Sequence, residues 1–568
     1  MSSSKFNIAS FVKGRVFIFS IFFGVLLNLF FMSIYPVFPD EITWRFLYSR
    51  FFIDNFEHFS YYKPCSILDD GFSIPFYLYP QFAILSIFSF FDNFISFRIF
   101  PLFSYISLLL FLLFFSFKKK IDPNIAWFIF LVFVLSTIGN SGAFWYAISR
   151  SEFIFNYFLF LIFYILFFRK VSFLWLLAIL LVFSTLAVSH PKFIYFTPIV
   201  IYFCFLLPSK KIYKFGISFF VLIYIILIIP VNTQIMFENC KEALPVFYNW
   251  LSGFNANPLN LFTDIKYFFS ELAIKTPIQL EMLLTRAPDQ LIFGNRPGAE
   301  LPQINQNFIS LFFSQNIRII YFIQLFIGFY FFLSYLYNFI YSFFKGFKNI
   351  NHSKNILFFL YLAIFIIIFF DRTTNAYTVS FWLLSITFFN CISFLSNVLE
   401  SNQRKFFIKL FSLNFVKYFK LYLLIIFLCN SLLIYIFYTK WILAKSNDAW
   451  IGMSSSSMYF SNKMKSELEA DFSLNCSSDA SLYLFDDHTY TTVFKGFSGK
   501  NITAVTYLML PFYASISPIT HAKNELDKFL DKNYSSVIFY GSCGFKPELP
   551  DSFIETHRNK YDMCCLKR

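Results

Sequence analysis

Two neighbouring carboxylates, Asp40 and Glu41, come shortly after the first long apolar run of the chain. A carboxylate can take the proton from an attacking hydroxyl group, and a pair of carboxylates can hold a divalent cation. Carboxylates at such a position also cap a following helix, here one expected at 42–52. Spacing alone favours the cap, so a chemical role for this pair depends on what else lies near it.

Other polar groups stand at the ends of later apolar runs: Arg150 with Glu152, His190 and Lys192 around Pro191, and Asp371 beside Arg372. Each group alone has a structural explanation, as an interfacial anchor, a local ion pair, or a turn whose lysine reaches the interface. Taken together with the first carboxylates, they place acidic and basic side chains on one face of the molecule. That combination suits an acceptor hydroxyl and a lipid-linked phosphate.

The elements that would carry these groups are apolar helices. The chain of 568 residues is 58% hydrophobic and 14% charged, with mean hydropathy +0.61, whereas soluble chains are about 45–50% apolar and about 25% charged. Runs close to the ~20 apolar residues that cross a bilayer predict spanning helices at 16–36, 95–117, 124–140, 152–168, 171–189, 191–207, 214–231, 316–340, 356–370, 376–395 and 421–438. A further apolar run at 72–91, which contains two prolines, is ambiguous.

The basic residues decide the orientation, because cytoplasmic loops are enriched in Lys and Arg. Basic clusters occur at 5–15, 118–120, 169–170, 210–214, 345–354 and 404–420. They all fall on one side if 72–91 stays at the interface, and they conflict if it crosses. We therefore predict about eleven crossings, an N terminus inside, a C terminus outside, and an uncleaved signal anchor as the first span.

The predicted architecture is an all-α polytopic membrane domain, 1–439, followed by a small extracytoplasmic α/β domain, 440–568. Outer loops are expected at 37–94 and 232–315. In the tail, strand-like runs at 481–485, 504–510 and 536–540 alternate with helix-like runs at 524–532 and 551–560. The tail carries neither a G-x-G-x-x-G fingerprint nor a Walker motif, so no nucleotide site is indicated.

Cysteines outside the predicted spans are Cys65, Cys240, Cys476, Cys543, Cys564 and Cys565. An oxidising compartment would allow disulfides among them. We expect at least one bridge within the tail, and none between the adjacent Cys564 and Cys565. The spacing leaves the pairing open, and without a C-x-x-C pair it gives little support to a metal site.

The charge pattern argues against two functional classes. The net charge of +14 does not indicate nucleic-acid binding, because the basic residues lie mainly in short loops between apolar runs. The predicted spans contain almost no ionisable side chains, which disfavours an ion-driven transporter. Chemistry at the membrane surface is favoured.

With its elements in this order, the chain resembles the polytopic GT-C glycosyltransferases, a superfamily that includes dolichyl-phosphate-mannose mannosyltransferases and bacterial aminoarabinose transferases. The resemblance begins with Asp40 and Glu41 after the first span. It continues with Pro-Phe-Tyr-Leu-Tyr-Pro at 75–80, Asn-Phe-Ile-Ser-Phe-Arg-Ile at 93–99, Arg-Ser-Glu at 150–152, His-Pro-Lys at 190–192 and Leu-Phe-Asp-Asp at 484–487. Asn93 stands where Gly is common in bacterial members, and the Pro-Pro-Leu seen before the position of Tyr77 in many relatives is missing.

The resemblance implies an inverting transfer of a sugar from a polyprenyl-phosphate donor to an envelope acceptor, which could be a glycan, a lipid or a protein. Asp40 or Glu41 would be catalytic, Glu152 would support them, and a divalent cation, if one is used, would bind at Asp40 and Glu41. The residues implied to meet the donor phosphate are Arg150, His190, Lys192 and Arg372. The resemblance also implies a bacterial inner membrane.

Two other functions stay open from the sequence. An O-antigen polymerase or ligase would rely on arginines of a large outer loop, such as Arg286 and Arg296, and would tolerate the loss of Asp40 and Glu41. A lipid or glycan flippase or transporter would move its cargo without forming a bond.

Overall fold

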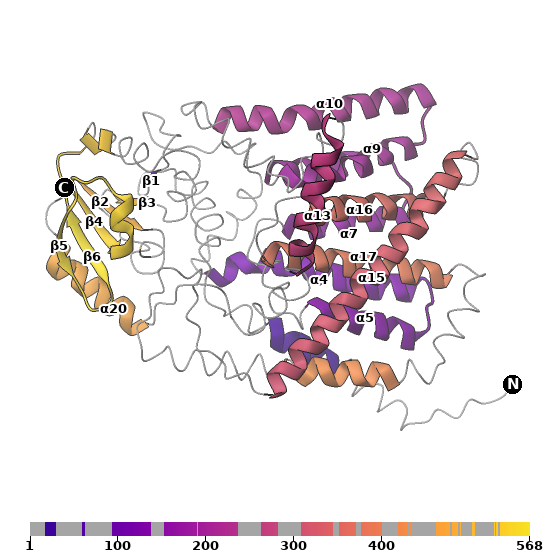
Figure 1. The fold of residues 1–568 in the computed structure, drawn as a ribbon, viewed down its shortest axis with the longest axis horizontal. Helices are drawn as coiled ribbons and strands as arrows, with labels where there is room; N and C mark the ends of the chain where they lie inside the picture. The colour runs from indigo at the N-terminus through magenta and orange to yellow at the C-terminus, as the bar shows by residue number, and fades with distance from the viewer. Residues whose placement is uncertain are drawn as a thin grey trace.

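The computed structural model describes a helical body and a separate β-sheet region (Figure 1). The described residues are 18–29, 60–62, 94–137, 153–189, 191–236, 263–281, 308–344, 351–370, 376–399, 418–429, 431–432, 462–477, 480–486, 489, 502–505, 527–528, 530–531 and 534–568.

The helical body consists of the apolar runs that the sequence marks out, and each predicted run overlaps a helix. The helices are Ile18–Leu29, α4 (Phe94–Lys118), α5 (Pro123–Thr137), α7 (Ile154–Phe168), α8 (Phe173–Ser189), η3 (Pro191–Phe196) continued by α9 (Thr197–Leu206), α10 (Lys211–Met236), α15 (Phe308–Phe344), α16 (His352–Phe370), α17 (Ala376–Leu399) and Tyr418–Cys429. A further helix, α13 (Ile265–Glu281), lies in the predicted outer loop 232–315.

Three of the described helices are long and apolar enough to cross a membrane by length and composition: Phe100–Lys118, Lys211–Ile228 and Phe322–Ser342. The other described helices of the body, α13 aside, are apolar but have shorter described stretches. The chain is therefore mostly helical with many apolar helices, while the count of about eleven crossings stays a prediction.

The body has one continuous apolar core in which phenylalanine rings pack among isoleucine and leucine side chains. Phe111 of α4, which is 1% exposed, lies 6.1 Å from the ring of Phe163 on α7 and 6.3 Å from the ring of Phe388 on α17. Offset and edge-on ring contacts of this kind add specificity to apolar burial. The outward faces are also apolar: Phe220 of α10 and Tyr330 of α15 are 71% and 63% exposed, which suits contact with lipid tails.

The C-terminal region supplies all strands but β1 of a six-stranded sheet in the order β1-β3-β2-β4-β6-β5. Its strands are β1 (Ser60–Tyr62), β2 (Leu482–Asp486), β3 (Ile502–Val505), β4 (Val537–Ser542), β5 (Ile554–Arg558) and β6 (Met563–Lys567). The strands β1, β3, β2 and β4 run parallel, and β6 and β5 form an antiparallel hairpin beside β4. A small C-terminal sheet with flanking helix α20 (Asn462–Asp471) thus agrees with the predicted α/β character of the tail.

Edge strand β1 comes from the predicted first outer loop, far from the other strands in sequence. It pairs with β3 in the register Ser60↔Thr503, Tyr61↔Ala504 and Tyr62↔Val505. The first loop and the tail therefore share one hydrogen-bonded sheet (Figure 1).

The two faces of this sheet carry separate apolar cores, and β6 contributes a cysteine to each. Successive side chains of a strand point to opposite faces. Cys564 therefore lies in the core around Leu484 and Phe539, whereas Cys565 lies in the core beneath Leu468 and Phe472.

The interpretation of 551–560 as a helix is wrong. Ile554–Arg558 is the edge strand β5, paired to β6 with an irregularity between Glu555 and His557. Local composition alone favours a helix for these charged residues. Alternating exposure along the strand and pairing to the buried β6 decide the outcome.

Candidate functional site

Most of the polar groups that the sequence marks lie outside the described residues: Asp40, Glu41, Arg150, Glu152, His190, Asp371 and Arg372. Lys192 lies in η3, where the structure describes its backbone. What the structure shows directly is how the helices next to these residues are arranged.

The first turn of α7 packs against η3. The ring of Phe155 lies 5.3 Å from that of Phe193 and 4.8 Å from that of Phe196, and all three side chains are at most 1% exposed. Phe155 is three residues after Glu152, and Phe193 is next to Lys192 in the chain. The described residues next to Glu152 and Lys192 in the chain therefore pack together in one cluster of phenylalanine rings.

Helix α16 contacts both η3 and α7. At the start of α16, the Tyr202 hydroxyl of α9 lies 2.9 Å from Nδ1 of His352 and accepts a hydrogen bond from the Asn355 amide. Helix α9 begins where η3 ends, and η3 also packs against α16. That helix ends at Phe370, directly before Asp371 and Arg372.

The described basic loops lie at the end of the body opposite to the start of α7. Lys119 lies over the ring of Phe168 at 5.8 Å, and the Lys420 ammonium donates to the Asn124 side chain at 3.0 Å. In Figure 1 the connection between α9 and α10, which contains Lys210, lies at the side of the body away from the sheet. The described basic clusters and the ends of the helices that lead to the predicted site are thus at opposite ends of the body.

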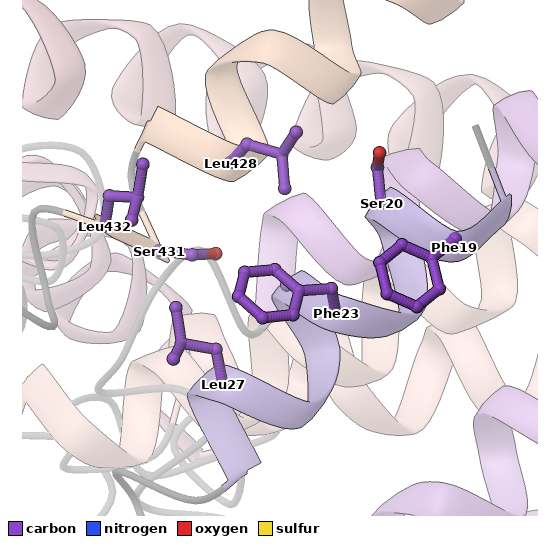
Figure 2. Close-up of a pocket in the computed structure, with 8 residues that line it drawn as sticks. Phe19, Ser20, Phe23, Leu27, Leu428, Ser431 and Leu432 are labelled. Carbon is purple, nitrogen blue, oxygen red and sulfur yellow. The ribbon is translucent and has the colours of Figure 1, made fainter. Parts of the chain in front are cut away.

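A pocket of about 200 Å³ lies between the first helix and the helix Tyr418–Cys429 with its continuation (Figure 2). Its lining is Phe19, Ser20, Phe23, Gly24, Leu27, Leu428, Ser431 and Leu432. Asn28 donates to the Ser431 hydroxyl at 2.6 Å and so joins the two helices. The lining has no titratable side chain, so the pocket offers no acid, base or ligand for a cation.

In the tail, Asp471 is the centre of a polar cluster that the sequence analysis missed. Its carboxylate accepts hydrogen bonds from Tyr540 at 2.8 Å, Asn559 at 2.8 Å and Asn475 at 2.7 Å, and lies 2.8 Å from Nε2 of His557. Burial by itself would raise the pKa of Asp471, but these hydrogen bonds outweigh it and hold the pKa below its usual value. The carboxylate ties the end of α20 to β4, to β5 and to the turn after β5.

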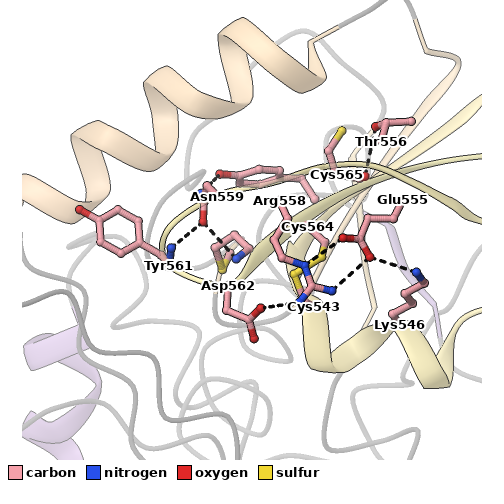
Figure 3. The surroundings of a disulfide bond; sticks show 12 residues. Cys543, Lys546, Glu555, Thr556, Arg558, Asn559, Tyr561, Asp562, Cys564 and Cys565 are labelled. Carbon is pink, nitrogen blue, oxygen red and sulfur yellow. Dashed lines mark hydrogen bonds and ion pairs between the residues drawn. A yellow bond between two sulfur atoms is a disulfide. The ribbon is translucent and has the colours of Figure 1, made fainter.

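The sheet is also cross-linked on both faces, by the disulfides Cys476–Cys565 and Cys543–Cys564. Figure 3 shows the second bridge beside an exposed ionic network around Glu555. Arg558 and Lys546 donate to this carboxylate at 2.9 and 3.0 Å. These hydrogen bonds, that of Arg558 first, lower the pKa of Glu555 to about 2. The expectation of at least one bridge in the tail, and none between Cys564 and Cys565, is confirmed.

Among the described residues, no group of three or more His, Cys, Asp and Glu side chains could hold a metal ion. The predicted cation site at Asp40 and Glu41 lies outside that part of the chain and stays a prediction.

No protein-family model and no curated protein matches this chain. Among solved structures, the chain is similar to the crystal structure of the Archaeoglobus fulgidus oligosaccharyltransferase tethered to an acceptor peptide that contains the NVT sequon. The similarity has a TM-score of 0.35 and 12% sequence identity, and it covers 93% of this chain and 69% of the archaeal one. At that distance the likeness supports no conclusion about activity.

Proposed function

We propose that this chain is an integral membrane glycosyltransferase of the GT-C type. It moves a sugar from a polyprenyl-phosphate donor to an envelope acceptor at the extracytoplasmic face of a bacterial inner membrane. The observation that carries the proposal is the packing of α7, η3 and α16 into one cluster, because these elements lead directly to Arg150, Lys192 and Arg372. Several cations at one membrane face suit a phosphate whose charge grows as its ester bond breaks.

The proposed reaction is a direct displacement at the anomeric carbon. The acceptor hydroxyl attacks C1 of the sugar, and its proton passes to the carboxylate of Asp40 or Glu41. As the new C1–oxygen bond forms, the bond from C1 to the phosphate oxygen breaks, and polyprenyl phosphate leaves with the electron pair. Attack from the face opposite the leaving group inverts the anomeric configuration.

Two further observations support the extracytoplasmic placement. Disulfides such as Cys476–Cys565 and Cys543–Cys564 persist in oxidising compartments. The described basic clusters lie at the other end of the helical body, as the positive-inside rule requires for the cytoplasmic side.

The test is sugar transfer by the purified full chain in nanodiscs, with a panel of polyprenyl-phosphate sugars as donors. We expect Arg150→Gln, Lys192→Gln and Arg372→Gln each to lower kcat/KM by about tenfold to a thousandfold, since each removes a charge from the leaving phosphate. Lys210→Gln, an exposed lysine at the other end of α9, is the matched control and should keep wild-type turnover. Wild-type kcat/KM in all three variants would contradict the proposal.

A further inference from the structure

Strand β1 connects the predicted catalytic loop to the tail sheet. The loop 37–94 carries Asp40 and Glu41 near its start and Ser60–Tyr62 further along. The described part of that loop is β1, and it is hydrogen-bonded along its length to β3 in the tail. A chain segment held by a ladder of main-chain hydrogen bonds moves with the sheet to which it belongs.

The sheet that receives β1 is rigidly built. Cys543–Cys564 joins β6 to the segment that follows β4, and Cys476–Cys565 joins β6 to the helical segment after α20. The Asp471 carboxylate, at the end of α20, adds hydrogen bonds to both β4 and β5. The tail can therefore act as one rigid unit to which the loop is attached.

The pairing also protects an edge. Without β1, the backbone of β3 would pair only with β2 and would leave one row of N–H and C=O groups open. Parallel strands are rarely left exposed, and an open edge invites pairing with other chains. Recruiting the first loop satisfies these groups within the molecule.

The shared sheet agrees with the predicted topology. Because β1 and β3 are neighbours, the first loop and the tail must lie on the same side of the membrane, and the crossings between them must be even in number. Between β1 and β3 the predicted spans from 95–117 to 421–438 are even in number. If 72–91 also crosses, the number of crossings between the two strands becomes odd. This parity agrees with the choice that the basic loops favoured.

We propose that the tail is a positioning domain for the first loop: β1 joins the loop to the sheet, and turnover by this predicted catalytic loop depends on that pairing. Tyr61, the central residue of β1, is thus a positioning residue. This inference rests on the proposed function for its effect on turnover, whereas the strand pairing can be tested without any substrate.

The pairing is tested by cross-linking in the full chain. Ser60→Cys/Thr503→Cys places thiols on paired residues about 4.8 Å apart, and a short bismaleimide should link them. A protease site inserted at 401–417 allows the chain to be cut between the two cysteines. After cleavage, the two fragments stay together on a denaturing gel only if the cysteines are linked. The control Ser60→Cys/Thr556→Cys places the second thiol on β5, about 24 Å away across the sheet order, and Thr503→Cys alone controls for reaction with Cys65. Failure of the first pair to link above these controls would overturn the pairing.

The positioning role is tested by turnover. We expect Tyr61→Pro, which removes a backbone donor from β1, to lower kcat at least tenfold while the donor KM changes less than threefold. Tyr61→Val, which keeps the strand, should behave as wild type. Cross-linking Ser60→Cys/Thr503→Cys in the Tyr61→Pro background should restore turnover. Efficient cross-linking without such a rescue would overturn the positioning role while leaving the strand pairing and the proposed transfer intact.

Discussion

Asp471 shows how single residues hold the tail together. It is a carboxylate with 15% of its side chain exposed, and four side chains surround it. Removing this charged acceptor weakens the links between α20, β4 and β5, and a hydrogen bond to a charged group contributes more than a neutral one.

We predict that Asp471→Ala lowers the unfolding free energy of the tail by about 1–3 kcal/mol at pH 7. Thermal unfolding of the full chain, followed by protease sensitivity of the tail, measures the change. Asp562→Asn is the control. Asp562 is 55% exposed and pairs with Arg558 at the surface, so its loss should cost less than about 0.5 kcal/mol.

The same residue sets a pH dependence with a definite sign. The pKa of Asp471 is lower in the folded chain than the ordinary value of 3.8 for an aspartate, so its stabilisation is fully present above about pH 4 and is lost as pH falls through the folded value. The wild-type tail should therefore lose more stability between pH 5 and pH 3 than Asp471→Asn does. An equal or greater loss in the variant would contradict the assignment.

The sequence could not show this cluster. Asp471 and His557 are far apart in the chain, and reading 551–560 as a helix gave His557 and Asn559 the wrong faces. By contrast, Arg150 and Lys192 stand out in the sequence because they interrupt long apolar runs, and their role in a site stays a prediction.

At the scale of elements, close helix packing explains why a glycine is needed in α15. A Cβ atom on Gly328 would lie 2.9 Å from Cγ2 of Ile386 on α17. Nearby, Asn390 accepts a hydrogen bond from Tyr361 of α16 at 2.7 Å and donates to the Gln324 side chain of α15 at 2.8 Å. Small residues that allow backbones to approach, together with buried amide hydrogen bonds, are what join helices where lipid provides no hydrophobic driving force.

Gly328→Ala should therefore lower the stability of the helical body by about 1–3 kcal/mol, since the stiff Ile386 side chain has to move. The midpoint of thermal unfolding in detergent is the measurement. Gly216→Ala on α10 adds the same atom where no neighbour lies within 4 Å and should leave the midpoint unchanged or slightly higher. If both variants shift the midpoint equally, the packing explanation is wrong.

Helices could be predicted from the sequence where a long apolar run gives a strong local signal. A run of uncharged apolar residues has one stable conformation in lipid, and the helices from α4 to α17, apart from α13, follow those runs. Strands β5 and β6 depend on partners elsewhere in the chain and on two disulfides, and neither dependence is visible in a ten-residue window.

At the scale of the whole molecule, the chain consists of a helical body with basic loops at one end and a disulfide-linked sheet to which the first loop contributes an edge strand. The arrangement separates a cytoplasmic end from an extracytoplasmic one in the proposed topology. The contribution of β1 could not be predicted, since Ser-Tyr-Tyr at 60–62 is too short to signal a strand and its partner is in the tail.

Labelling in intact cells tests this topology. A membrane-impermeant maleimide should modify Lys528→Cys, an exposed position of the tail, in spheroplasts. It should modify Lys210→Cys only after permeabilisation, because that residue lies at the end with the basic loops. Labelling of Lys210→Cys in intact spheroplasts would reverse the predicted orientation.

The central claim is that carboxylate-assisted sugar transfer from a lipid-linked donor takes place on this scaffold. The most direct measurement is release of polyprenyl phosphate, with labelled sugar appearing on acceptor, by wild type, Asp40→Asn and Glu41→Gln in nanodiscs. Asp122→Asn, at the end with the basic loops, is the matched control. We expect turnover in wild type and control, and a loss of about a hundredfold or more in at least one carboxylate variant. Equal turnover in all four proteins would contradict the claim, as would movement of an intact donor across the bilayer with no polyprenyl phosphate released.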